Sequence, residues 1–223
     1  MEAQTRFASD ASHELRTPLA AIQAENEVAL RKSNLTLARA KELLQSNLEE
    51  ANKLRLLAEG LLQLTRTEHT TVHRAAIALS DISTNAINRI IPAAQAKDIT
   101  VTDVVENFQV RGDEGLLTQA VVILLDNAVK YSPEHTTIHI SAVTEGKWAI
   151  IQVRDEGPGI ADADQAHVFE RFYRADASRS SQHTTGYGLG LSIAHKIIEL
   201  HDGHISVAST PGHGATFTLK LPL

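Results

Sequence analysis

The feature that most constrains the fold is a long helix-forming stretch at the start of the chain. Residues 3 to about 66 contain one proline, Pro18, and one glycine, Gly60, and only the polar segment RKSNLT at 31–36 interrupts them. Two helices joined by so short a connection form an antiparallel hairpin. The sequence therefore predicts a helical hairpin as the first structural unit.

An apolar stripe runs along the second of these helices. Its members recur at spacings of three, four and seven residues. They are Leu37, Leu44, Leu48, Ala51, Leu54, Ala58 and Leu61, widened by Leu43, Leu57 and Leu64. One hairpin cannot bury so wide a stripe, whereas two hairpins can bury it in a four-helix bundle. We therefore expect a homodimer; the alternative is that the hairpin packs on the second half of its own chain.

Charge and composition exclude several classes of protein. The formal net charge of −6 argues against a nucleic-acid-binding protein, which usually carries a basic surface. The chain has no cysteine, so it has neither disulfides nor a thiolate metal site. Its longest unbroken apolar run, AVVILL at 120–125, is far too short to span a bilayer.

After a polar segment at 67–73, strand and helix patterns alternate. Strands are expected at 74–79, 99–105, 108–112, 136–143, 147–155, 204–209 and 215–221, and helices at 81–97, 113–131, 163–173 and 188–202. Ser80 is the expected N-cap of the first of these helices. The two strand patterns at 136–143 and 147–155 alternate as an antiparallel pair should. The second half is thus predicted to be an α+β layer, a mixed sheet with helices on one face.

His13 lies on the polar side of the first helix. At about 100° per residue it points away from the apolar seam, which consists of Phe7, Ala11, Leu15, Leu19 and Ile22. Glu14 lies beside it and Thr17 follows one turn later. Pro18 cannot donate to the carbonyl of Glu14, so the helix is expected to bend there. A neutral imidazole attacks through one ring nitrogen when a carboxylate holds the other N–H, so His13 is a candidate nucleophile; the alternative is an ordinary surface histidine, one of eleven.

Four short segments in the second half have the residue types of a nucleotide site. In LLDNAVKYS (124–132), Asn127 offers an oxygen suited to Mg²⁺ and Lys130 shares its helix face. In VRDEGPGI (153–160), Asp155 precedes a glycine turn and is placed to accept a hydrogen bond from an adenine amino group. Taken singly, the first also reads as an ordinary helix end and the second as a tight turn.

The third segment is longer. FERFYRADASRSSQHTTGYGLGLSIAHKII (169–198) passes from an aromatic and basic helix end through a polar stretch typical of a mobile lid. Glycines then open a helix, and backbone N–H groups at such a position cradle phosphate. The fourth segment, PGHGATF (211–217), adds a loop for close approach or a plain hairpin turn.

In their joint order these motifs resemble those of bacterial sensor histidine kinases over nearly the whole chain. SDASHELRTPL resembles the H box of that family, LLDNAVKY the N box, DEGPG the G1 box, FERFYR the F box, GYGLGL the G2 box and GHGATF the last glycine box. The resemblance implies a dimeric phosphotransfer hairpin at 1–67, forming a four-helix bundle, and an ATP-binding domain of the GHKL type at 68–223. It implies the cofactors ATP and Mg²⁺, and a response-regulator receiver domain as partner, with no nucleic acid.

The resemblance also implies roles for individual residues. His13 would take the γ-phosphoryl group of ATP, with Glu14 as its base or orienting group. Thr17 would assist dephosphorylation of the regulator. Asn127 would hold Mg²⁺, and Asp155 would read adenine. The other implied nucleotide contacts are Lys130, Tyr131, Gly157, Gly159, Arg171, Arg174, Gly186, Gly188, Leu189, Gly190 and Thr216.

Two positions depart from the family pattern. Ile123 stands where the N box usually begins with asparagine, and Ala215 stands where serine or threonine is frequent. The leading hypothesis is an autophosphorylating histidine kinase that relays the group to an aspartate and also removes it. The alternatives are a nucleotide-binding dimeric scaffold, a phosphatase-dominant core with weak kinase activity, and a GHKL ATPase of the chaperone or DNA-repair kind.

The family pattern also predicts what surrounds this chain. Only twelve residues precede His13, whereas family members usually carry a sensor, a membrane span and a linker upstream. We expect this chain to be the cytoplasmic part of a longer protein anchored in the bacterial membrane through those upstream segments.

Overall fold

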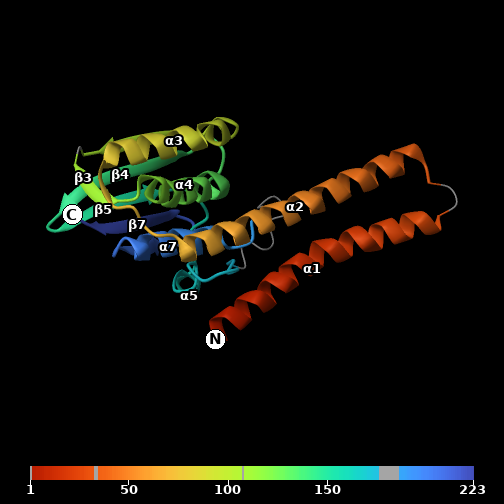
Figure 1. Cartoon of the computed structure of the whole chain (residues 1–223). Coiled ribbons are helices and arrows are strands. Elements are labelled where there is room, and N and C mark those ends of the chain that lie inside the picture. Colours follow the sequence, from red (N-terminus) through yellow and green to blue (C-terminus); the bar gives the residue numbers. More distant parts are fainter. Residues whose placement is uncertain (1, 33–34, 107, 176–185) are drawn as a thin grey trace.

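The computed structural model describes residues 2–32, 35–106, 108–175 and 186–223. Two long helices, α1 (Glu2–Arg31) and α2 (Leu37–His69), form a hairpin that projects from the rest of the molecule as an arm (Figure 1). Thr36 begins α2 by accepting a hydrogen bond from the backbone N–H of Arg39 at 3.3 Å. The predicted hairpin is confirmed, while its expected turn at Ser33 and Asn34 lies outside the described residues.

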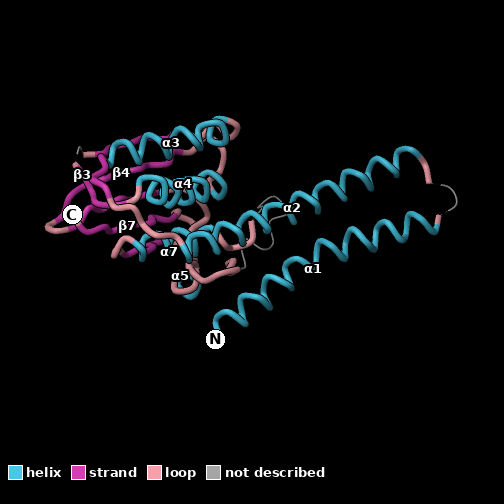
Figure 2. Tube along the Cα trace, in the orientation of Figure 1, coloured by secondary structure: helices cyan, strands magenta, loops and turns pink. Residues whose placement is uncertain are grey.

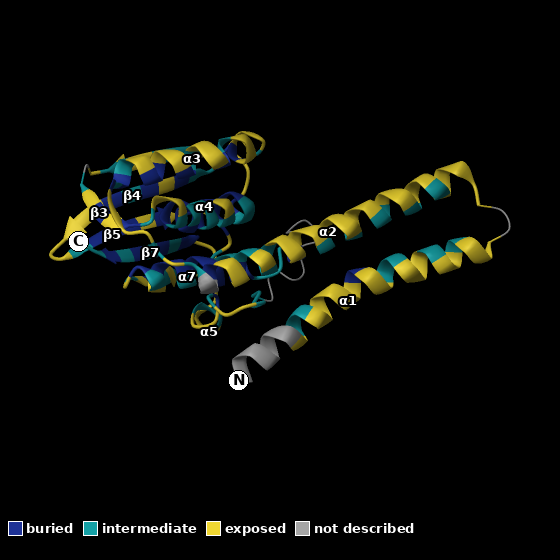
Figure 3. Ribbon diagram, in the orientation of Figure 1, coloured by how far each residue is buried: buried dark blue, intermediate teal, exposed yellow. Residues whose placement is uncertain are grey.

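The apolar stripe of α2 has two different environments. Near the connection, Leu44 and Leu48 are 67% and 63% exposed, so this part has no cover within the chain. Toward the C-terminal end, Leu57 and Leu64 are fully buried. There α2 packs on the second half of the molecule (Figure 3). The alternative of packing within one chain therefore holds for the end of α2, and the homodimer stays a prediction for the remainder.

The described residues of the second half form two sheets (Figure 2). A small antiparallel pair joins β1 (Ala75–Ala78) to β3 (Gln109–Gly112). The main sheet has the order β2-β4-β5-β7-β6. Its strands are β2 (Thr100–Val105), β4 (Thr137–Glu145), β5 (Trp148–Arg154), β6 (His204–Ser209) and β7 (Ala215–Pro222). Because β2 runs parallel to β4 and the other pairs are antiparallel, the predicted mixed sheet is confirmed.

Three helices cover one face of the main sheet: α3 (Leu79–Gln95), α4 (Glu114–Tyr131) and α7 (Gly190–Leu200). The strands alternate accordingly. In β7 every second residue from Ala215 to Leu221 is buried and the intervening ones are not. This alternation is what a sheet with one covered face requires, and it places the core between the sheet and the helices.

Two expected helix boundaries are wrong. Ser80 does not cap α3, because β1 runs directly into this helix and the N–H of Leu79 donates to the carbonyl of Phe108 at 3.0 Å. The helix expected at 163–173 is only α5 (Asp162–Gln165). Phe172 leaves helical geometry with a φ of 62°, and its N–H donates to the carbonyl of Gly188.

Within the described ranges, no helix has the length and apolar character needed to cross a membrane.

Candidate active site

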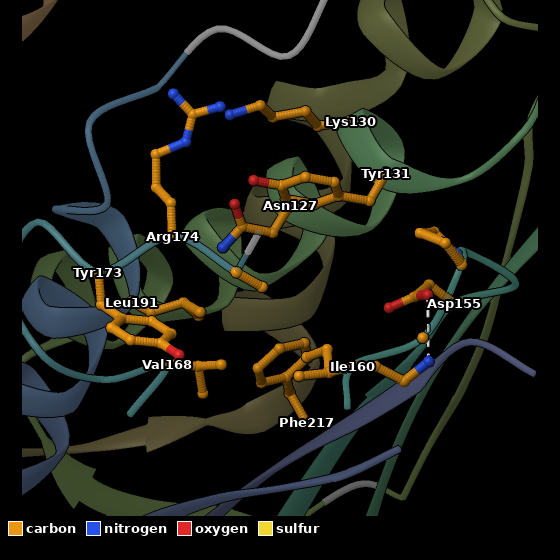
Figure 4. Close-up of a pocket in the computed structure, with 14 residues that line it drawn as sticks. Asn127, Lys130, Tyr131, Asp155, Ile160, Val168, Tyr173, Arg174, Leu191 and Phe217 are labelled. Atoms are coloured by element: carbon orange, nitrogen blue, oxygen red, sulfur yellow. Dashed lines mark hydrogen bonds between the residues drawn. The ribbon is translucent and has the colours of Figure 1, made fainter. Parts of the chain in front are cut away.

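A cavity of about 310 Å³ opens at the C-terminal end of α4 (Figure 4). Segments far apart in the sequence enclose it: α4, the turn after β5, the segment after α5, the start of α7 and the beginning of β7. The residues that line it are Asn127, Lys130, Tyr131, Asp155, Pro158, Gly159, Ile160, Val168, Tyr173, Arg174, Ala175, Leu191, Ala215 and Phe217.

Asp155 supplies a buried carboxylate at one side of this cavity. One of its oxygens accepts hydrogen bonds from the backbone N–H groups of Gly157 at 2.8 Å and Ala215 at 3.2 Å. Burial raises the pKa of this carboxyl, and the two backbone N–H groups oppose that shift. Figure 4 shows the carboxylate pointing into the cavity. The arrangement fixes one oxygen on the backbone and presents the group to a ligand that donates a hydrogen bond.

Cationic side chains gather at the opposite side. Lys130 follows Asn127 by one turn of α4, and its ammonium lies 5.2 Å from the ring centroid of Tyr131. Figure 4 shows the charged ends of Lys130 and Arg174 close to one another. Burial and the Arg174 guanidinium lower the pKa of Lys130 to about 8, while Asp126 opposes the shift. Two like charges kept together in a partly buried site favour an anion between them.

The glycine loop before α7 packs closely against the backbone of the segment that carries Arg174. Gly188 has a φ of 68°, and a Cβ there would overlap the carbonyl oxygen of Tyr173. α7 itself begins without a side-chain cap, and this leaves its first N–H groups to a ligand or to water. The expected lid residues 176–185 lie outside the described residues.

Two turns interlock on the Asp155 side. Gly159 has a φ of 73°, and a Cβ there would overlap the carbonyl of Thr210 in the turn between β6 and β7. Across the same contact, the N–H of Gly212 donates to the carbonyl of Pro158 at 2.7 Å. This bond and the close approach at Gly159 hold the glycine turn against the turn between β6 and β7, at the Asp155 side of the cavity.

Several expected nucleotide contacts stand next to the cavity without lining it. Gly186 adjoins the Lys130 ammonium, Gly190 adjoins Ile123, and Leu189 adjoins Gly60 of α2. Arg171 is exposed and is not among the lining residues of the described chain, whereas Arg174 is.

Thr216 is misplaced by the sequence-based assignment. Its neighbours Ala215 and Phe217 line the cavity and are buried. Because successive strand residues face opposite sides, Thr216 faces the other side of the sheet. The alternation of ATFTLKL was the signal that could have shown this. It would also have pointed to Phe217, a wall residue that motif matching missed.

The apolar walls were missed as well. Ile160, Val168 and Leu191 come from three separate segments and converge only in the folded chain. Tyr173 also lines the cavity, and its hydroxyl donates to a carboxylate oxygen of Asp164 at 2.5 Å. Apolar walls with a few placed polar groups are typical of a small-molecule site.

On the hairpin, His13 and Glu14 are exposed on α1. The hydroxyl of Thr17 donates to the carbonyl of His13 at 3.3 Å, and Pro18, within the helix, is buried. The glycine loop lies near both helices of the hairpin: burial first, and then the carboxylates of Glu50 in α2 and Glu14 in α1, raise the pKa of Tyr187 to about 12, against the opposing effect of Arg174. The candidate nucleophile and the candidate nucleotide cavity therefore belong to neighbouring parts of the molecule.

Comparison with known families agrees with these two parts. Residues 3–70 match the His Kinase A (phospho-acceptor) domain, and residues 112–223 match the histidine kinase-, DNA gyrase B-, and HSP90-like ATPase family. The sensor-like histidine kinase SenX3 of Mycobacterium tuberculosis (strain ATCC 25618 / H37Rv) is 41% identical over 228 residues, covering 100% of this chain and 55% of that protein. The chain thus spans about half the length of the curated relatives it matches.

Two solved structures are similar over nearly the whole chain. Full-length ShkA in complex with AMPPNP has a TM-score of 0.67 and 25% identity, covering 98% of this chain and 45% of that one. The histidine kinase ThkA in complex with the response regulator protein TrrA has a TM-score of 0.77 and 20% identity, covering 99% and 61%. At the latter identity the likeness shows the fold alone.

Proposed function

The chain belongs to the sensor histidine kinases, and we propose that it transfers the γ-phosphoryl group of ATP to His13 and then to an aspartate of a response-regulator receiver domain. The observation that carries the proposal is the polarity of the cavity. Asp155 presents a carboxylate at one side, and Lys130 and Arg174 present two cations at the other. A nucleotide has the matching polarity, with an amino group on its base and negative charge on its phosphates.

In this proposal the adenine amino group donates to Asp155, and the phosphates contact Lys130, Arg174 and the start of α7. Asn127 lines the same cavity. Mg²⁺ is usually bound through one or two protein oxygens together with substrate phosphates and water, so this residue fits the ion. Asn127 would hold Mg²⁺, and the bound ion would neutralise phosphate charge. The complex of ShkA with AMPPNP, an ATP analogue, supports the nucleotide assignment.

The proposed transfer uses the exposed imidazole of His13. One ring nitrogen attacks the γ-phosphorus, the bond from that phosphorus to the β,γ-bridging oxygen breaks, and ADP leaves. Glu14 holds or accepts the proton of the other ring nitrogen. Phosphoryl transfer depends mainly on positioning and charge neutralisation. The cations of the cavity supply the charge neutralisation.

Assembly, partner and location are further parts of this proposal. The uncovered leucines of α2 support a homodimer in which two hairpins, residues 1–67, form a four-helix bundle beside the ATP-binding units, residues 68–223. The complex of ThkA with TrrA supports a receiver domain as partner. We place the chain on the cytoplasmic side of a longer, membrane-anchored protein.

Thr17 points to a second activity, dephosphorylation of the regulator. Its hydroxyl lies one helical turn from His13 and bonds the His13 carbonyl, so it is placed to orient a water on a phosphoryl group held nearby. Replacing Thr17 with alanine should slow regulator dephosphorylation and leave labelling of His13 intact. Unchanged dephosphorylation contradicts this role.

One observation favours a weaker kinase or a scaffold. Ile123 occupies the first N-box position, and a Cβ on Gly190 would lie 3.3 Å from its Cγ2 atom, so an apolar contact stands where the family usually has an amide. This alternative predicts that the chain binds ATP analogues without forming phosphohistidine, and that Ile123→Asn increases labelling.

The deciding experiment is incubation with γ-labelled ATP and Mg²⁺, comparing wild type with His13→Gln. The exposed His135→Gln is the matched control. Kinase activity predicts acid-labile, base-stable label on the wild type and the control, and none on His13→Gln. A wild type that binds AMPPNP without taking label contradicts the kinase proposal and favours the scaffold.

A further inference from the structure

Lys97 lies outside the nucleotide cavity and bonds the backbone of the helix that helps to line it. It sits in the turn between α3 and β2 and is half-buried. Its ammonium donates to the carbonyls of Val129 at 2.9 Å, Lys130 at 3.0 Å and Ser132 at 3.1 Å. An ammonium has three N–H donors, so these bonds use all of them.

The acceptors are the carbonyls that a helix leaves unpaired at its C-terminal end. α4 ends at Tyr131, and the N–H of Ser132 takes up the carbonyl of Ala128. Lys97 takes up the next two carbonyls and one beyond the helix. A cation is also favoured at this end by the helix dipole. The last turn of α4, which carries Lys130 and Tyr131 into the cavity, is therefore closed by a side chain from another element.

The backbone around Lys97 is hydrogen-bonded to the loop that follows α4. Its carbonyl accepts from the N–H of His135 at 3.2 Å, and the N–H of Thr100 donates to the carbonyl of Thr136 at 3.0 Å. These bonds join the turn after α3 to the loop after α4. Lys97 therefore starts from a fixed backbone, so its ammonium holds the α4 end in one place.

Lys130 needs such an anchor. Its ammonium lies in a partly buried site beside the Arg174 guanidinium, and both effects disfavour its charge there. A side chain in that situation gains by swinging toward water. A fixed helix end keeps the backbone of Lys130 at the place from which its side chain reaches the cavity.

We propose that Lys97 is a positioning residue for nucleotide binding: by closing the last turn of α4 it holds Lys130 at the phosphate side of the cavity. The inference rests on the proposed function, because it assigns Lys130 to the phosphates of ATP.

The test compares Lys97→Met with Lys97→Arg in the full chain, using AMPPNP and adenosine as ligands. The methionine keeps the unbranched stem and loses the donors, so AMPPNP should bind about tenfold more weakly. Adenosine lacks phosphates and should bind within about twofold of wild type. Arginine keeps the positive charge and N–H donors for these carbonyls, so it should restore most of the affinity. Lys147→Met, at the turn between β4 and β5, is the matched control and should change neither affinity.

A double-mutant cycle separates positioning from general loosening. If Lys97 acts through Lys130, then Lys97→Met should have little further effect on AMPPNP affinity once Lys130 is methionine. Hydrogen exchange at the end of α4 should be faster in Lys97→Met and normal in Lys97→Arg. If Lys97→Met is too unstable for titration, Lys97→Arg and Lys130→Met can still be compared directly with wild type. Their hydrogen exchange at the end of α4 and their AMPPNP affinities are then the readouts.

Each outcome decides the matter. Equal loss of AMPPNP and adenosine affinity, or full additivity with Lys130→Met, overturns the positioning role. Wild-type AMPPNP affinity in Lys97→Met overturns it as well, and leaves the proposed function standing. A wild-type chain that binds no AMPPNP overturns the proposed function and this inference together.

Discussion

In α4 of the nucleotide-binding half, Leu117, Leu124 and Leu125 are at most 1% exposed, whereas in α2 of the hairpin Leu44 and Leu48 are 67% and 63% exposed. Both helices are rich in leucine. Of the thirteen large apolar side chains that are exposed in the described part of the chain, ten lie in the hairpin. The nucleotide-binding half thus buries its large apolar side chains together with Leu57 and Leu64 from the end of α2, whereas most of the hairpin leaves its own exposed.

Polar groups do not separate the two halves so cleanly, because Ser83, Gln119 and Ser132 in the nucleotide-binding half each bury a side-chain atom that has no hydrogen-bond partner in the described structure. The ring of His201 lies inside the nucleotide-binding half, where its Nδ1 bonds the carbonyl of Ile197 at 2.7 Å and its Nε2 accepts from the N–H of Asp113 at 3.0 Å. Between the hairpin helices, Asn47 donates to Asn26 at 3.1 Å, but the Oδ1 atom of Asn47 is buried with no hydrogen-bond partner in the described structure. It is the exposed leucines, rather than the polar groups, that mark the hairpin as a surface built to be covered.

The largest effect is expected from charges on the uncovered stripe. In a dimer, Leu44 and Leu48 of both hairpins would be buried, and each of these four side chains contributes about 1.5–3 kcal/mol. Leu44→Glu with Leu48→Glu should therefore weaken the homodimer by about 5 kcal/mol or more, which sedimentation equilibrium would show as a monomer. AMPPNP affinity should stay at the wild-type value, because the cavity lies in the other half.

Gln45→Glu is the control for this variant, since it adds a charge on the same helix about a quarter turn from Leu44. It should leave the dimer intact. A double variant that remains dimeric, or one that loses AMPPNP binding, breaks the distinction between the halves.

The next effect in size concerns Asp155, and it should be confined to the nucleotide-binding half. In Asp155→Asn the amide oxygen can still accept from Gly157 and Ala215, and the amide N–H₂ then faces the cavity, where it opposes an adenine amino group. We expect AMPPNP affinity to fall by about 2 kcal/mol, or roughly 30-fold, in calorimetric titrations, with the dimer unchanged. The exposed Asp103→Asn on β2 is the control. Wild-type affinity in Asp155→Asn contradicts the adenine assignment.

The same contrast explains which parts of the fold the sequence predicts. Periodicity reported the hairpin, the stripe and the antiparallel strand pairs, because each follows from neighbours along the chain. It predicted a helix over 163–173 where only α5 (Asp162–Gln165) is helical, because the segment that follows α5 bonds to Gly188 through the N–H of Phe172, sixteen positions away in the chain. It also misplaced the start of α3. Ser80 was expected as the N-cap, but the helix starts at Leu79, whose N–H donates to the carbonyl of Phe108 in a distant segment.

The site divides in the same way. Asn127, Lys130 and Asp155 belong to compact motifs, and the structure brings them to one cavity. Ile160, Leu191 and Phe217 have no motif of their own, because an apolar wall is defined only by which segments meet. Thr216 was assigned from its motif, although strand alternation turns it to the other face.

A smaller effect tests whether the nucleotide-binding half depends on its internal polar bonds. A carbonyl only accepts and a backbone N–H only donates, so His201 must be neutral with its proton on Nδ1. Burial first, and then the Arg74 guanidinium, lower the pKa of His201 below its usual 6.5; the Ile197 carbonyl and the carboxylates of Asp113 and Asp202 oppose this. Above pH 6.5 the folded and unfolded forms are both neutral. As the pH falls below that value the unfolded chain takes up the proton first, so stability is lost.

Fluorescence of the single tryptophan, Trp148 in β5, reports unfolding of this half alone. Between pH 7.5 and 5.5, wild type should lose about 1 kcal/mol more of its unfolding free energy than His201→Gln. Glutamine can donate and accept without titrating, and the other histidines cancel in the comparison. Equal pH slopes for the two proteins would show that His201 is not a determinant of stability.

The smallest effect returns to the hairpin and its incomplete polar pair. Asn26 continues the apolar seam of α1, and Asn47 lies at the edge of the exposed stripe of α2. A lone buried asparagine in a coiled-coil core lowers stability but fixes register and oligomeric state. The Asn26–Asn47 pair lies between α1 and α2, so in a four-helix bundle made of two hairpins it would belong to the core.

Asn26→Leu with Asn47→Leu should therefore tighten association by about 1 kcal/mol and make it less uniform. Sedimentation velocity should resolve trimers or larger species beside the dimer, whereas the wild type gives one species. Asn52→Leu, exposed on α2, is the matched control and should do neither. A weaker but uniform dimer in the double variant would mean that the asparagine pair does not set the oligomeric state.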